Sequence, residues 1–179
     1  RPLVEEFPRV PAYQVELAAG EEKLARLLRG RRDFAAARPL LEGAVSHLRA
    51  GMTIDARSAS REFLSSCAWL LADTLLLLGE YRAAAGIADE LPGICPDRWQ
   101  ECYQAARLLT RCVSAAGQDS AAPRGELTEQ YSRKAVALLR QARSRGYADV
   151  GFLKTDPGLD VLRGREDFSR MLGESQAPP

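Results

Sequence analysis

The chain has 179 residues, which is enough for one domain with a substantial core. Its 25 Lys and Arg balance 24 Asp and Glu, so the total charge indicates neither a nucleic-acid partner nor an anionic membrane surface. Ala, Leu, Arg and Glu dominate while Val and Ile are sparse, and this composition favours helix over sheet.

The longest apolar run, from Ala68 to Leu78, is too short to cross a bilayer and contains Asp73. We therefore expect no membrane insertion by this piece itself. Because the chain opens at Arg1 without Met, we expect an excised piece of a longer protein. Its location is then either cytoplasmic or attached to a membrane through a missing segment.

Helical periodicity predicts a single all-α domain over residues 1–179. We expect three helix pairs, at about 12–50, 58–91 and 97–145, followed by a terminal cap at 147–173. In the first helix, the apolar stripe is predicted to be Leu17, Leu24, Leu27 and Leu28, with Gly20 as a weak point.

Turn and capping residues set the expected helix boundaries. Asp33 is predicted to cap the second helix and Gly51 to end it, and Gly79 is predicted to end the third as a C′ residue. We expect Pro92 and Gly93 to close the fourth helix. The pattern Asp97-x-x-Gln100 predicts a capping-box variant at the start of the fifth.

Later signals mark a loop, a sixth helix and its end. The polar stretch 118–125, "QDSAAPRG", is predicted to be the most flexible segment. A sixth helix is expected at about 128–145, with Gly146 as its C′ residue.

The acids between residues 146 and 168 are interpreted as helix caps. Asp149 and Asp156 each precede a short apolar segment, and Pro157 occupies the favoured first position of its helix. We expect the apolar residues of this segment to cover the open edge of the sixth helix, as the end of a repeat array requires. These are Tyr147, Phe152, Leu153, Leu159, Leu162, Phe168 and Leu172. A Ca²⁺ loop is not expected, because the acids at 156, 160, 166 and 167 lack the required spacing.

Two windows of the chain resemble each other. "GRRDFAAARPLLEGAV" and "LGEYRAAAGIADELP" share a tight turn, an aromatic residue (Phe34, Tyr81) and an alanine three residues later (Ala37, Ala84). The aromatic residues are 47 positions apart, a spacing typical of a helix pair.

These residues resemble the tetratricopeptide repeat, with its turn glycine, the aromatic residue two positions later and its small residues at helix crossings. The middle of the chain matches this pattern at Leu71, Ala72, Gly79, Tyr81 and Ala84. The earlier window matches less closely, at Leu24, Ala25, Phe34, Ala37 and Ala44, with Arg32 at the turn-glycine position. The resemblance implies antiparallel helix hairpins stacked into an α-α superhelix, although the period exceeds the usual 34 residues.

Three longer segments are similar to the C-terminal repeat region of planctomycete-type bacterial serine/threonine protein kinases. They are "VEEFPRVPAYQVELA", "LLLLGEYRAAAGIADELPGICPDRWQECYQAARLLTRC" and "AVALLRQARSRGYADVGFLKTDPGLDVLRGREDFSRML". The kinase's own motifs are absent, so this piece is not expected to phosphorylate anything. The resemblance implies a protein-interaction or regulatory region of a larger kinase-like protein.

No residue pattern predicts a catalytic, cofactor or metal site. The four cysteines, Cys67, Cys95, Cys102 and Cys112, have no metal-binding spacing, so we expect buried thiols, or a disulfide in an oxidising compartment. His47 lacks a catalytic partner motif.

Three other sets of residues have plain structural interpretations. "RGRR" at Arg29 to Arg32 is interpreted as a solvated helix end, although it could also contact phosphate or RNA. Arg107 and Arg111 could line a groove for an acidic peptide or pair with Glu101 or Asp119. Trp69 and Trp99 are expected in the core.

The sequence therefore predicts a non-catalytic module that binds a protein or peptide partner, with its partner-binding residues unknown. The resemblance to the tetratricopeptide repeat implies that a peptide or partner helix binds in a groove presented on the first, third and fifth helices. The alternative is a structural spacer or self-association domain with no separate ligand.

Overall fold

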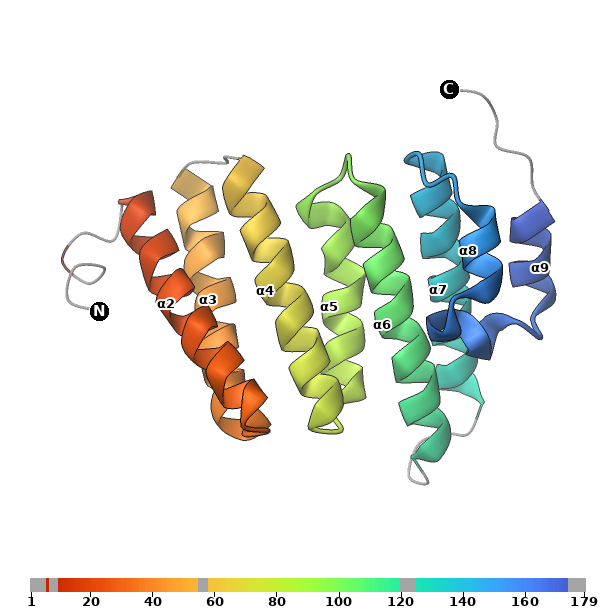
Figure 1. Cartoon of the computed structure of the whole chain (residues 1–179), viewed down its shortest axis with the longest axis horizontal. Coiled ribbons are helices and arrows are strands. Elements are labelled where there is room, and N and C mark those ends of the chain that lie inside the picture. Colours follow the sequence, from red (N-terminus) through yellow and green to blue (C-terminus); the bar gives the residue numbers. More distant parts are fainter. Residues whose placement is uncertain (1–5, 7–9, 55–57, 120–124, 174–179) are drawn as a thin grey trace. The chain divides into compact units, whose positions relative to one another are not determined.

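The computed structural model describes residue 6 and residues 10–54, 58–119 and 125–173, and this part of the chain is helical with no strand (Figure 1). The all-α fold of consecutive antiparallel helices is confirmed. The chain divides into two compact units, Arg1–Glu80 and Tyr81–Pro179. The expected single domain remains a prediction, and the predicted flexible loop lies largely outside the described residues.

The first unit contains α2 (Pro11–Gly30), α3 (Phe34–Ile54) and α4 (Ser58–Leu77). α3 packs against both of the other helices, and most extensively against α2. The α2–α3 contact is rich in small side chains, and Ala18, Ala25, Ala37 and Ala44 are fully buried. Alanine allows the two helix backbones to approach closely.

Two turns of this unit, the one between α2 and α3 and the one that follows α4, have a residue in the left-handed region. Gly79 has φ +81°, and Arg32 occupies the corresponding turn with φ +60°. After Gly79, the N–H of Glu80 donates to the carbonyl of Leu75 at 2.8 Å, which closes the turn expected of a C′ glycine. Asp33 caps α3, since its Oδ1 accepts from the N–H of Ala36 at 3.1 Å.

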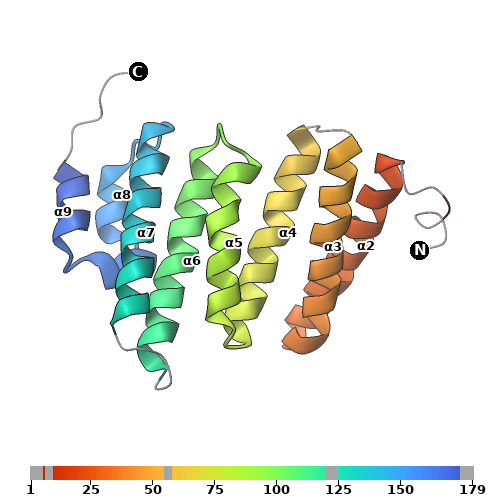
Figure 2. The ribbon, with the colours of Figure 1, turned by 180° about the vertical axis from the view of Figure 1, so that it is seen from behind.

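The second unit begins with α5 (Tyr81–Ile94), α6 (Trp99–Gln118) and α7 (Glu126–Ser144), and α6 packs between the other two (Figure 2). Gly146 ends α7 with φ +100°, as predicted. The rings of Tyr81 and Tyr131 meet edge to face, and the hydroxyl of Tyr81 donates to Asp119 at 2.8 Å.

The terminal cap consists of α8 (Val150–Thr155), the 3₁₀ helix η1 (Pro157–Leu162) and α9 (Glu166–Gly173). Asp149 accepts from the N–H of Phe152 and Asp156 from the N–H of Gly158, so both predicted caps are confirmed. η1 packs mainly on α6, and α9 packs on α7. Most of the apolar side chains predicted to cover this end are buried: Tyr147, Leu153, Leu159, Leu162 and Phe168. Phe152 is an exception because half of it is exposed.

Three predicted helix boundaries are wrong. α3 continues past Gly51 to Ile54, and Gly51 is buried, where an added Cβ would lie 3.5 Å from Cβ of Gln14 and 3.7 Å from the carbonyl oxygen of Pro11. α5 continues through Pro92 to Ile94, where Pro92 is buried and its carbonyl accepts a hydrogen bond from Arg145 at 3.1 Å. α6 begins at Trp99 with Arg98 at the N-cap position and no side-chain cap, so the predicted capping box at Asp97 does not form.

Candidate functional site

The polarity of α2 is inverted relative to the usual amphipathic helix. Its buried residues are mostly polar or small: Gln14, Ala18, Glu21, Glu22 and Ala25. Two of its leucines lie outward, since Leu24 and Leu27 have 48% and 67% of their surface exposed, whereas Leu17 and Leu28 are half-buried. The prediction that these leucines form the core stripe of this helix is therefore wrong.

The buried polar side chains of α2 are accommodated by α3. Nδ1 of His47 lies 2.8 Å from Oε1 of Gln14, and Nε2 of the same ring lies 3.8 Å from Oε2 of Glu21. A Cβ at position 43 would lie only 2.8 Å from that carboxylate oxygen, so Gly43 provides the space that Glu21 occupies. Among the described residues, Oε2 of Glu21 has no hydrogen-bond partner. A buried carboxylate oxygen without a hydrogen-bond partner costs free energy of folding. Close packing of the buried alanines between α2 and α3 must therefore favour the orientation of α2 that buries Glu21.

An arginine at the end of α2 fixes the same rotation. The guanidinium of Arg29 donates to the carboxylate of Asp73 and the hydroxyl of Thr74, both on α4. Its cationic group also lies 5.9 Å from the ring centre of Phe34 on α3. Because Arg29 points toward α3 and α4, the residues on the opposite side of α2 must point outward.

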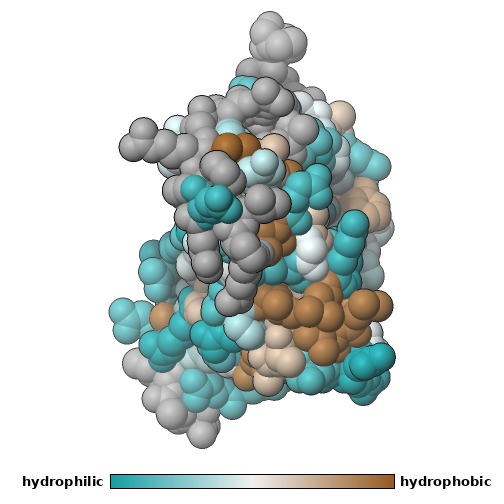
Figure 3. Space-filling model, turned by 90° about the vertical axis from the view of Figure 1, so that its left-hand side faces the viewer, coloured by the Kyte–Doolittle hydropathy of each residue, from teal (hydrophilic) through white to brown (hydrophobic). Residues whose placement is uncertain are grey.

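A continuous strip runs along this outward side of α2. We call it the leucine strip and define it as Tyr13, Leu17, Gly20, Leu24 and Leu27, which recur every three or four positions. Gly20, Leu24 and Leu27 are exposed, and the other two members are half-buried. Figure 3 views the molecule from the side on which α2 lies, and an apolar patch is visible there among polar surroundings. Elsewhere in the part of the chain that the structure describes, the exposed large apolar side chains lie singly on three different elements: Leu77, Phe152 and Val161. Scattered apolar residues are normal on a surface, whereas adjacent ones on one helix indicate a contact surface.

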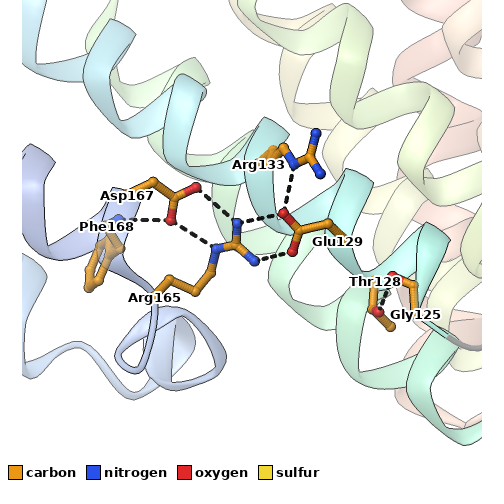
Figure 4. Close-up of polar contacts among 7 residues, drawn as sticks. All are labelled: Gly125, Thr128, Glu129, Arg133, Arg165, Asp167 and Phe168. Atoms are coloured by element: carbon orange, nitrogen blue, oxygen red, sulfur yellow. Dashed lines mark hydrogen bonds and ion pairs between the residues drawn. The ribbon is translucent and has the colours of Figure 1, made fainter.

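Part of the second unit presents a dense ionic cluster (Figure 4). Arg165, just before α9, donates to both carboxylate oxygens of Glu129 on α7 and to both oxygens of Asp167. Arg133 donates to Glu129 from the next turn of α7 at 2.6 Å. Hydrogen bonds from Arg165 and Arg133 lower the pKa of Glu129 to about 2, and Arg165 also lowers the pKa of Asp167.

This cluster holds the cap in place and is not suited to binding a ligand. The guanidinium of Arg165 is already saturated by two carboxylates, and the hollow beside it is wide and shallow. To bind Arg165, an incoming anion would have to displace the carboxylate of Glu129 on α7 or of Asp167 on α9.

A buried carboxylate anchors the other side of the cap. Asp156 is almost fully buried, accepts from the hydroxyl of Tyr103 on α6, and lies 3.5 Å from Nε of Arg107. Burial, followed by the hydrogen bond to Asp156, raises the pKa of Tyr103. The ring of Tyr103 stacks on Tyr147 with centres 5.5 Å apart. These contacts fix η1 on α6.

The other residues considered as site candidates from the sequence are the cysteines, Arg107 and the arginines of "RGRR". All four cysteines are free and buried, and burial raises the pKa of Cys67 and Cys112 to about 12. Arg107 pairs with Asp156 and not with the alternatives named from the sequence. Within "RGRR", Arg29 is engaged with α4, while Arg31 and Arg32 are exposed.

The described residues contain no group of three or more His, Cys, Asp or Glu side chains that could hold a metal ion. None of the described helices combines the length and apolar character needed to traverse a bilayer. No protein-family model, curated protein or solved structure matches the chain.

Proposed function

We propose that this chain is a non-catalytic protein-interaction module whose docking surface is the leucine strip of α2. The observation that supports the proposal is the inverted polarity of α2, which buries Glu21 and Glu22 while exposing Leu24 and Leu27. Exposed leucines on adjacent turns lose hydrophobic free energy unless another surface covers them, at about 25 cal/mol for each Å². A helix face of this kind fits the groove or face of a second helix.

The proposed setting is the C-terminal repeat region of a planctomycete-type serine/threonine kinase, with a tetratricopeptide-like stack of helix hairpins. The helix hairpins and small residues at the α2–α3 crossing support this setting. In that setting α2 is the first helix, one of the three from which such arrays present their binding surface.

A photo-crosslinking experiment tests the proposal. A benzophenone amino acid replaces Leu27 in the full-length protein in its source cells, and the matched control carries it at Ser46, which is exposed on α3. We expect a protein adduct from position 27 and none from position 46. Equal labelling from both positions, or none from position 27, would refute the leucine strip as a docking surface.

A further inference from the structure

The leucine strip is flanked by two charges of opposite sign. Glu16 and Lys23 are exposed, and neither forms an ion pair with any other residue in the described part of the chain. They are seven residues apart, which is two helical turns or about 10.5 Å along α2. Both therefore lie on the same edge of the strip, with the acid nearer the start of α2 and the base nearer its end.

Gly20 lies in the middle of the strip, between these charges. It is exposed, and a Cβ added there would meet no atom within 4 Å. Glycine inside a helix costs about 1 kcal/mol relative to alanine, and no neighbour within the molecule requires it here. A glycine at such a position allows the backbone of another molecule to approach closely.

We propose that the leucine strip binds a second copy of the same strip, antiparallel to it, with the two-fold axis at Gly20. This inference rests on the proposed function, because it names the partner of that same surface. In a symmetric pair of this kind the same patch of each copy faces the other. Residue n then faces residue 40 − n of the second copy, a relation that follows from placing the axis at Gly20.

This register is complementary in shape. Leu27 lies level with Tyr13 of the second copy, and Leu24 lies level with Glu16, one position from Leu17. The two glycines meet at the axis, where the helices cross most closely. The leucines of each copy are thereby covered at both ends of the contact.

The same register is complementary in charge. A two-fold axis perpendicular to α2 brings the same edge of each strip together, so Glu16 lies beside Lys23 of the second copy, and the pair occurs twice. A parallel two-fold pair would instead place the charged edges of the two copies on opposite sides of the contact, so that neither Glu16 nor Lys23 would meet an opposite charge of the other strip. An exclusively acidic or basic partner helix would be repelled at one of the two charges.

The interface is small, so the association should depend on concentration. A stable interface buries about 800 Å² on each partner, whereas a 20-residue helix is only about 30 Å long and offers one face. We therefore expect a dimer that forms in the micromolar range and dissociates on dilution.

Sedimentation velocity of the whole chain over a range of concentrations tests this inference. The variants are Glu16→Lys, Lys23→Glu and the double exchange, with Lys154→Glu on α8 as a matched charge reversal elsewhere. All three positions are exposed, so the fold should be preserved. Each single exchange should weaken the dimer several-fold, and the double exchange should restore it. A mixture of the two single variants should dimerise more strongly than either variant alone.

Three results would overturn the inference: a monomer at every concentration, a dimer that none of these variants affects, or single losses that the double exchange does not restore. Failure of the dimer can be distinguished from failure of the proposed docking function. A monomeric chain that still crosslinks from position 27 to a different protein would remove the second copy as partner and keep the docking surface.

Discussion

Replacing Arg32 by glycine should stabilise the first unit, although the substitution removes a whole side chain. Arg32 has φ +60°, and a residue with a Cβ loses about 1–2 kcal/mol in the left-handed region. Glycine avoids that strain but adds about 0.4–1 kcal/mol of conformational entropy to the unfolded chain. The exposed side chain of Arg32 contributes little, so the net gain in the free energy of unfolding should be about 0.5–1 kcal/mol.

The opposite substitution, at the turn that follows α4, is the matched control. Gly79 has φ +81° with open space around its Cα, so Gly79→Ala introduces strain without a steric clash. Alanine at this positive φ adds strain to the folded state, and it lowers the conformational entropy of the unfolded chain, which offsets part of that strain. The net loss in the free energy of unfolding should be about 0.5–1 kcal/mol.

Urea denaturation followed by tryptophan fluorescence separates the two units. The chain has two tryptophans, Trp69 in the first unit and Trp99 in the second, so a Trp99→Phe background reports the first unit alone. The midpoint should rise for Arg32→Gly and fall for Gly79→Ala, with the slope unchanged. A lower midpoint for Arg32→Gly would refute the assignment of a strained turn to that position.

Three further predictions concern the cap. The pKa of Glu129 is lowered to about 2, so its ion pairs with Arg165 stabilise the fold above its unfolded pKa, near 4.3, and this contribution is lost as the pH falls toward 2. Glu129→Gln should remove that step from an acid titration followed by circular dichroism, and an unchanged titration would contradict the assignment. Tyr103→Phe should cost about 1–3 kcal/mol in urea denaturation, because Asp156 keeps its burial and loses one donor. Leu159→Ala should cost about 2–5 kcal/mol in the same assay, since the side chain is fully buried, and a loss below about 1 kcal/mol would mean that η1 does not pack on α6.

The turns and caps were predictable because their determinants are local. Asp33, Asp149 and Asp156 each accept from a backbone N–H two or three residues away, so the sequence pattern contains both partners. Gly79 and Gly146 end their helices with positive φ, a conformation that glycine adopts without strain.

Boundaries that depend on distant residues were not predictable. A proline followed by a glycine usually ends a helix, yet α5 continues through Pro92, whose carbonyl accepts from Arg145, 53 residues away. Gly51 is buried inside α3, and the nearest atoms outside that helix belong to Pro11 and Gln14 near the start of α2. The residues that neighbour Pro92 and Gly51 in the sequence do not indicate either contact.

The candidate site was missed for a related reason. Leucines at 24 and 27 at helical spacing normally indicate the core, and nothing nearby in the sequence shows that α2 is rotated away from that orientation. The rotation depends on Ala18 and Ala25 fitting against α3 and on Arg29 reaching Asp73, 44 residues away. The only available signal was the polar spacing of Gln14, Glu21 and Glu22 on one side of the helix.

The rotation of α2 is the claim on which both proposals depend, and thiol labelling measures it directly. Leu27→Cys and Ala25→Cys are compared at low protein concentration, where the four native cysteines are buried and react slowly. The structure predicts that the thiol at position 27 reacts roughly a hundredfold faster than the thiol at position 25, because only the former is open to solvent. Faster labelling at position 25 would show that the leucines form the core of the first unit and would contradict the docking surface.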